Sequence, residues 1–107
     1  TNMQSTNKEK YLQIKAKYPN RIPLIVHVHQ GNEKKLVLKK NKFLVLPDLT
    51  VGQLLFVIRK QIDLDSSQAL FISSEGMMLT GAATISSICP GVEDFIHLFI
   101  AAENTFG

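Results

Sequence analysis

Few side chains in this sequence have the types and spacing that catalysis requires. His27 and His29 lie two residues apart on an expected strand, so both rings would share one face and could bind a metal ion. No cysteine or carboxylate is visibly placed to complete a shell of metal ligands. We therefore interpret the two histidines as structural polar residues. Cys89 lies beside Pro90 without an identifiable base, which indicates an ordinary structural cysteine. We therefore expect no enzyme, no bound metal and no cofactor.

Composition narrows the class of protein further. The 107 residues include a single cysteine, which cannot form an internal disulfide, so a disulfide-rich secreted domain is excluded and a reducing compartment is favoured. No apolar run approaches the roughly 20 residues of a membrane-spanning helix. The polar start over residues 1–10 lacks the apolar core of a signal peptide. With 45% hydrophobic residues, the sequence predicts one soluble intracellular domain.

Charge is unevenly distributed along the chain. Residues 1–42 hold ten of the twelve Lys and Arg residues and two acidic residues, whereas residues 43–107 hold seven acidic residues. A basic half of this kind could bind nucleic acid, but no aromatic residues interleave with its lysines to stack on bases. A solvated face, or a docking surface for acidic peptides or anionic lipid, fits better. We expect no nucleic-acid partner.

Lysines directly precede an apolar strand in the segment 39–46 (KKNKFLVL). Lysines of this kind protect a sheet edge from indiscriminate pairing, and such an edge can also accept a peptide as an added strand. Leu44 and Leu46 alternate with Phe43 and Val45, so one side can face the core while the other forms the floor of a pocket. The pattern alone leaves a docking site and plain core packing equally open.

The elements that would position these residues follow from hydrophobic periodicity and turn signals. Two strands precede one long helix and further strands follow it, which indicates an α+β roll in which a small mixed sheet wraps over that helix. The expected elements are a helix over 8–17, a strand over 21–30, a partly paired stretch within 35–42, a strand over 43–46, a helix over 51–62, strands over 69–73 and 77–79, a helix over 82–88 and a central strand over 95–100.

The long helix has the clearest signal. Thr50 and Gln53 have the spacing of a capping box, which predicts that the helix begins after Thr50. Phe56 and Val57 lie off the apolar stripe, so the helix either packs on two sides or offers apolar surface to another molecule. The stripe itself consists of Val51, Leu54, Leu55, Ile58 and Ile62.

Three segments closely resemble one protein family. They are KYPNRIPLIV at 17–26, FLVLPDLTVGQLLFVIRKQI at 43–62 and ENTFG at 103–107, and the match runs in register from about residue 8 to the end. The family is the ubiquitin-like autophagy modifiers of the GABARAP and microtubule-associated light chain three type. The resemblance implies a ubiquitin-like β-grasp roll, an α+β fold, with a short N-terminal helical extension.

The resemblance implies conjugation through Gly107. Residues 1–7 would form a flexible N-terminus, 8–102 the ubiquitin-like domain with its N-terminal helix, and 103–107 a flexible conjugation tail. An activating and a conjugating enzyme would join Gly107 to phosphatidylethanolamine on autophagosomal membranes, and a cysteine protease would process the precursor and release the conjugate. The protein would be cytoplasmic, and on the autophagosome membrane when lipidated. The alternative is an unconjugated ubiquitin-fold module that binds peptides, for example on the cytoskeleton.

The resemblance also implies a docking site for adapter peptides in which an aromatic residue is followed three positions later by Leu, Ile or Val. The peptide would add as a strand beside the second strand of the sheet. Arg21 and Lys42 would meet acidic residues that flank the motif. The aromatic residue would enter a pocket formed by Ile14, Pro23, Lys42, Leu44 and Phe95. The aliphatic residue would enter a pocket formed by Phe43, Val45, Leu46, Leu49, Leu54 and Val57.

The sequence departs from the family pattern at several positions. Lys10 stands where relatives usually have Glu at the rim of the aromatic pocket. Gln61 stands where they have a basic residue that contacts the peptide, and Leu79-Thr80 replaces a Pro-Pro pair. We expect these departures to affect adapter preference more than conjugation, which depends mainly on the tail.

Overall fold

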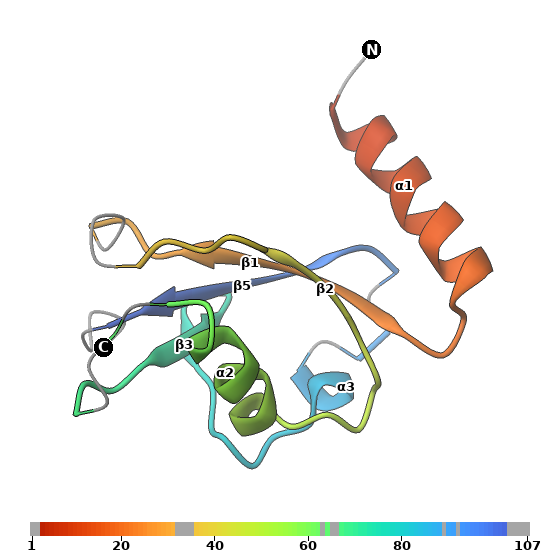
Figure 1. Cartoon of the computed structure of the whole chain (residues 1–107). Helices are drawn as coiled ribbons and strands as arrows, with labels where there is room; N and C mark the ends of the chain where they lie inside the picture. The colour runs from red at the N-terminus through yellow and green to blue at the C-terminus, as the bar shows by residue number, and fades with distance from the viewer. Residues whose placement is uncertain are drawn as a thin grey trace.

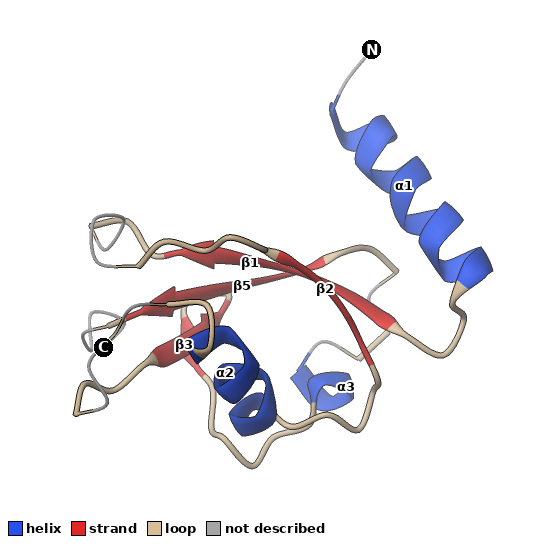
Figure 2. Cartoon of the chain, in the orientation of Figure 1, coloured by secondary structure: helices blue, strands red, loops and turns tan. Residues whose placement is uncertain are grey.

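In the computed structural model, a five-stranded mixed sheet curves over one central helix (Figures 1 and 2). The structure describes residues 3–31, 36–62, 64, 67–88, 90–91 and 93–102, with the side chains of 3–7 left out, so Cys89 and Gly107 lie outside these ranges. The elements are α1 (Met3–Lys17), β1 (Ile22–Val28), β2 (Lys42–Val45), α2 (Val51–Arg59), β3 (Phe71–Ser74), β4 (Met77–Met78), α3 (Ile85–Ile88) and β5 (Ile96–Ala101).

The strand order is β2-β1-β5-β3-β4, so the last strand in sequence is the central one, as its apolar faces predicted. β5 runs parallel to β1, with Leu24 opposite Ile96 and Val28 opposite Ile100. The other pairs, β1 with β2, β3 with β5 and β3 with β4, are antiparallel. This mixed sheet with helices confirms the predicted α+β roll.

The core lies between the sheet and α2. The predicted capping box is present, because the Thr50 hydroxyl accepts from the Gln53 amide and the Gln53 side chain accepts from the Thr50 amide. From this start, the apolar stripe of α2 faces the strands, where Leu98 and Ile100 of β5 are completely buried. α2 and α3 cover one face of the sheet, and α1 lies on the other side (Figure 1).

Three elements differ from the sequence prediction. α1 begins at Met3 instead of residue 8, because no proline or glycine interrupts the helix between Met3 and Lys17. α2 ends at Arg59 instead of Ile62, since the chain tightens there into bonds between residues three apart, such as Ile62 N–H to the Arg59 carbonyl at 3.2 Å.

The partly paired stretch expected before β2 is the third difference. Residues 36–41 form no strand, although the side chain of Leu36 is buried in the core. The remaining strands and α3 agree with the expected elements, with ends that differ by up to three residues. No helix in the described ranges is long and apolar enough to cross a lipid bilayer.

Candidate docking site

A pocket of about 360 Å³ lies between α1, β1 and the start of β2, with an apolar floor and three lysines. We call it the lysine-rimmed pocket. Its size is near the small end of the range for ligand-binding clefts. All five residues predicted for the aromatic pocket line it, and their role as a docking site stays a prediction. The lining residues are Lys10, Gln13, Ile14, Pro23, Leu24, Lys40, Lys42, Phe43, Leu44 and Phe95.

Helix α1 contributes one wall through residues three and four positions apart. Lys10, Gln13 and Ile14 share a face of the helix, so all three reach the same pocket. β2 contributes the opposite wall, where Lys42 and Leu44 alternate with the more buried Phe43. The sequence pattern therefore explains why these side chains converge once α1 lies across β1.

Tyr11 fixes α1 in this position, a role that the sequence analysis missed. Its side chain is only 6% exposed, and its ring packs edge-to-face with that of Phe95, with the centroids 5.9 Å apart. Phe95 in turn lines the lysine-rimmed pocket. The available signal was a single aromatic residue three positions before Ile14 on a mostly polar helix.

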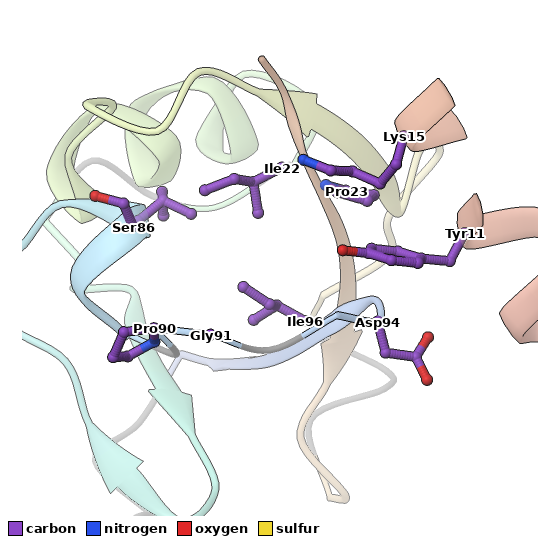
Figure 3. Close-up of a pocket in the computed structure, with 10 residues that line it drawn as sticks. Tyr11, Lys15, Ile22, Pro23, Ser86, Pro90, Gly91, Asp94 and Ile96 are labelled. Carbon is purple, nitrogen blue, oxygen red and sulfur yellow. The ribbon is translucent and has the colours of Figure 1, made fainter. Parts of the chain in front are cut away.

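A second, smaller pocket of about 200 Å³ lies on the Tyr11 side of α1, and we call it the Tyr11 pocket (Figure 3). Ile22 and Ile96 point toward each other across it, and the Tyr11 ring enters from the helix. The other lining residues are Lys15, Pro23, Ile85, Ser86, Pro90, Gly91 and Asp94.

The lysine of the Tyr11 pocket is engaged within the protein. The Lys15 ammonium donates to the carbonyls of Pro19 at 3.2 Å and Arg21 at 3.0 Å, which fastens the turn between α1 and β1. Burial, together with the negative charges of Glu93 and Asp94, raises the pKa of Tyr11, because each disfavours the phenolate.

β2 is an edge strand, and its register shows which backbone groups are open. Val26 N–H donates to the Asn41 carbonyl at 2.7 Å, and hydrogen-bonded pairs alternate along an antiparallel ladder. The N–H and carbonyl groups of Lys42 and Leu44 therefore point away from β1. Arg21 Nη1 approaches the Leu44 carbonyl at 3.5 Å, which brings this predicted peptide contact to the same edge.

Gln61 supports the rim of the lysine-rimmed pocket. Its side-chain oxygen accepts from the Lys40 amide at 2.8 Å, and its side-chain nitrogen donates to the Lys40 carbonyl at 3.1 Å. The Lys40 ammonium lies over the Phe43 ring, 5.6 Å from the centroid. Gln61, identified from sequence as a departure from the family pattern, thus holds the backbone of one rim lysine.

The six residues predicted for the aliphatic pocket divide into two groups. Phe43 and Leu54 belong to the core, where Leu54 is 1% exposed, and Val45 and Leu49 pack against it. Leu46 and Val57 are exposed, Val57 by 45%. An aliphatic anchor at this place would therefore contact Leu46 and Val57 above a floor of core side chains, and this part of the site stays a prediction.

His27, one of the two histidines that could bind a metal ion, contacts two other side chains. His27 Nε2 and His97 Nδ1 share a hydrogen bond of 2.8 Å, and Phe99 stacks on the His27 ring at 4.9 Å. Burial and the adjacent His97 lower the pKa of His27, because both disfavour its protonated form. Among the described residues, no group of three or more His, Cys, Asp or Glu side chains is placed to hold a metal ion.

Comparison with known families decides the identity of the fold. The family described as "Autophagy protein Atg8 ubiquitin like" matches residues 5–107, which is nearly the whole chain and includes every residue of the lysine-rimmed pocket. The chain belongs to the Atg8 family.

Individual Atg8 proteins agree with this assignment. The chain is 40% identical over 97 residues to autophagy-related protein 8e of Arabidopsis thaliana, covering 88% of this chain and 79% of the relative. It is 41% identical over 97 residues to autophagy-related protein 8 of Emericella nidulans, covering 88% and 81%.

A solved structure extends the likeness to three dimensions. The crystal structure of Trypanosoma brucei ATG8 matches with a TM-score of 0.83 at 27% identity, covering 100% of this chain and 94% of that one. The roll of this chain is therefore the ubiquitin-like Atg8 fold, and the chain is an autophagy protein of the ubiquitin-like class. The resemblance stated from the sequence is confirmed.

Proposed function

We propose that this Atg8-family chain is a ubiquitin-like modifier, conjugated through Gly107 to phosphatidylethanolamine on autophagosomal membranes, that recruits cargo receptors and adapters through peptide docking. The observation that carries the docking proposal is an apolar pocket directly beside an open strand edge. The family match extends through Gly107, which supports conjugation at that residue. The proposed partners are the activating and conjugating enzymes, a cysteine protease and adapter peptides, and the protein would move between cytoplasm and autophagosome membrane.

The edge geometry supports a motif with two anchors three residues apart. A peptide that pairs with β2 would bond to the outward backbone groups of Lys42 and Leu44. Successive side chains of an extended strand point to opposite faces, so anchors at positions one and four enter opposite sides of the sheet. One side presents the lysine-rimmed pocket, and the other presents the face where Val57 of α2 is exposed.

Conjugation is tested with purified family activating and conjugating enzymes and liposomes that contain phosphatidylethanolamine. We expect a lipidated product with the native chain and none with Gly107→Ala, because the added methyl group hinders the acyl carbon and removes the flexibility of glycine. The product is measured by its mobility shift and mass. A matched Gly81→Ala variant, at a glycine without a positive φ whose added Cβ would meet only ordinary van der Waals contacts, should be lipidated normally. Equal absence of product from native chain and Gly107→Ala would contradict the proposal.

Docking is tested with a Trp-x-x-Leu peptide and Leu44→Arg. The half-buried Leu44 lines the lysine-rimmed pocket, and a charged side chain there should weaken binding by about tenfold or more, since it occupies the apolar floor. Calorimetry measures the affinity. Met77→Arg is the matched control, because Met77 is 73% exposed on β4 at the opposite edge.

The aliphatic side requires a different variant from a change at Leu54, which the family resemblance suggests. Leu54→Arg would place a charge in the core and unfold the protein, so its loss of binding would mean little. Val57→Arg changes an exposed residue and should reduce binding while circular dichroism stays native. A folded Leu44→Arg protein that binds the peptide normally would show that the docking site lies elsewhere.

A further inference from the structure

We propose that the lysine-rimmed pocket selects an anionic aromatic anchor, with the side chain of phosphotyrosine as its preferred occupant over the indole of tryptophan. This inference rests on the proposed docking function and specifies the ligand chemistry of the same pocket. It follows from the hydrogen-bonding character of the lining, from the state of its lysines and from the apolar floor beneath them.

The side chains that line the pocket offer almost only donors. Lys10, Lys40 and Lys42 carry ammonium groups, which donate and cannot accept, and six of the other lining side chains are apolar. Gln13 supplies the one side-chain acceptor, through its amide oxygen. An indole N–H is a donor only and finds a single candidate side-chain partner here, whereas a phosphate offers acceptor oxygens to all three ammonium groups.

The three ammonium groups are available to a ligand. Within the described part of the chain, none of them makes a hydrogen bond or an ion pair, and the contact of Lys40 is with the face of the Phe43 ring. Other lysines of the same region are engaged, since Lys8 donates to the Glu93 carbonyl and Lys15 to two carbonyls. Three of the lysines without such partners, Lys10, Lys40 and Lys42, therefore lie together at the apolar pocket.

The lysines also create a one-sided field. Lys10 comes from α1 and the other two from the segment that leads into β2, so positive charges face the opening from two walls. Among the residues that the structure describes, no carboxylate lines the pocket to neutralise them. Like charges that surround a partly apolar opening raise the local preference for an anion.

The floor fits an aromatic ring. Ile14, Pro23 and Leu44 are apolar, and Phe95 is held edge-on by Tyr11, so a ring can pack on all of them. A phosphate group on that ring adds a charge of about −1.5 to −2 with three acceptor oxygens. A phosphotyrosine side chain therefore satisfies the floor and the rim together.

The experiment compares four peptides that share one flanking sequence. They contain Trp-x-x-Leu, Tyr-x-x-Leu, phosphotyrosine-x-x-Leu, and Tyr-x-x-Leu with a phosphoserine outside the motif. We expect the phosphotyrosine peptide to bind about tenfold tighter than the tyrosine peptide and tighter than the tryptophan peptide, since each exposed lysine contributes modestly. Phosphoserine outside the motif should add less, and added salt should reduce the difference between the phosphorylated peptides and the others.

Charge reversal at the rim provides the matched variants. Lys10→Glu replaces a donor by an acceptor, so it should abolish the advantage of the phosphotyrosine peptide and strengthen binding of the tryptophan peptide, whose indole gains a partner. Lys17→Glu makes the same change of charge on the same helix outside the pocket, where the Lys17 ammonium lies 5.6 Å from the Tyr18 ring centroid. It should leave the order of the peptides unchanged, and circular dichroism verifies that both variants are folded.

The outcomes separate the two proposals. If the tyrosine and tryptophan peptides bind and the phosphotyrosine peptide does not bind more tightly than both of them, the proposal of an anionic anchor is wrong and the docking site stands. If phosphoserine outside the motif helps as much as phosphotyrosine, the attraction belongs to the basic face in general and the proposal is equally overturned. If no peptide binds, the proposed docking function itself fails.

Discussion

The two pockets beside α1 share a wall and differ in what their charged groups do. Pro23 lines both. In the Tyr11 pocket, Lys15 is bonded to carbonyls of the α1–β1 turn, and a carboxylate, that of Asp94, is also present. The described residues that line the lysine-rimmed pocket include three lysines and no carboxylate.

This difference separates a pocket that holds the protein together from one that can hold a ligand. One face of α1 is used to attach the helix, and the adjacent face forms a binding wall, although most residues of the helix are polar. Charge at a pocket therefore indicates a ligand only where the protein leaves that charge without an internal partner.

The largest effect on both pockets should come from removing the Tyr11 ring, which attaches α1. Tyr11→Ala should lower the free energy of unfolding by about 3 kcal/mol, because a buried aromatic side chain and its edge contact with Phe95 are lost. Chemical denaturation measures the effect, and peptide affinity should fall as well. Tyr11→Phe, which keeps the ring, should stay within about 0.5 kcal/mol of the native chain. Normal peptide binding by Tyr11→Ala would show that the two pockets are independent.

A smaller effect is expected at Gln61, which supports only the lysine-rimmed pocket. Gln61→Ala removes two hydrogen bonds to the Lys40 backbone and should cost about 1–2 kcal/mol in the free energy of unfolding. Affinity for the tyrosine and tryptophan peptides should drop a few fold, because the rim segment is held less firmly. Gln68→Ala, at an exposed glutamine, is the control and should change stability by less than about 0.5 kcal/mol. Equal effects of the two variants would remove Gln61 from the site.

The smallest effect lies outside both pockets, at His27. Its pKa in the folded protein is below the ordinary value of 6.5, so the unfolded chain binds a proton first as the pH falls. The stability contribution of neutral His27 is complete above about pH 6.5 and is lost as the pH falls from there toward the folded pKa.

Denaturation at pH 7.5 and pH 5.5 measures this loss, which His27→Gln should reduce. Binding of the tryptophan peptide should change little over the same range, because His27 does not line either pocket. If the affinity depended on pH while the stability did not, the conclusion that His27 affects stability and not binding would be wrong.

Much of the fold could be predicted because its signals are local. The capping box at Thr50, the stripe that buries Ile58 and the alternation that makes β5 central all depend on residues close in sequence. The five residues of the predicted aromatic pocket came from a family resemblance, while the pattern itself left docking and core packing open.

The contacts that the sequence did not reveal join distant positions. Tyr11 meets Phe95, Gln61 holds Lys40 and His27 bonds to His97, and no periodicity within one element connects such pairs. The role of Leu54 shows the opposite case, since its place on the α2 stripe correctly indicated burial.

The central place of β5 has a consequence for the order of events during synthesis. A ribosome delivers α1, β1 and β2 first, and β1 must wait for the last strand to pair with its second edge. Phe95, which closes the lysine-rimmed pocket, emerges immediately before that strand. A nascent chain therefore has the lysines of the pocket long before it has the pocket, so an interrupted translation product would expose the basic surface without being able to hold an aromatic anchor.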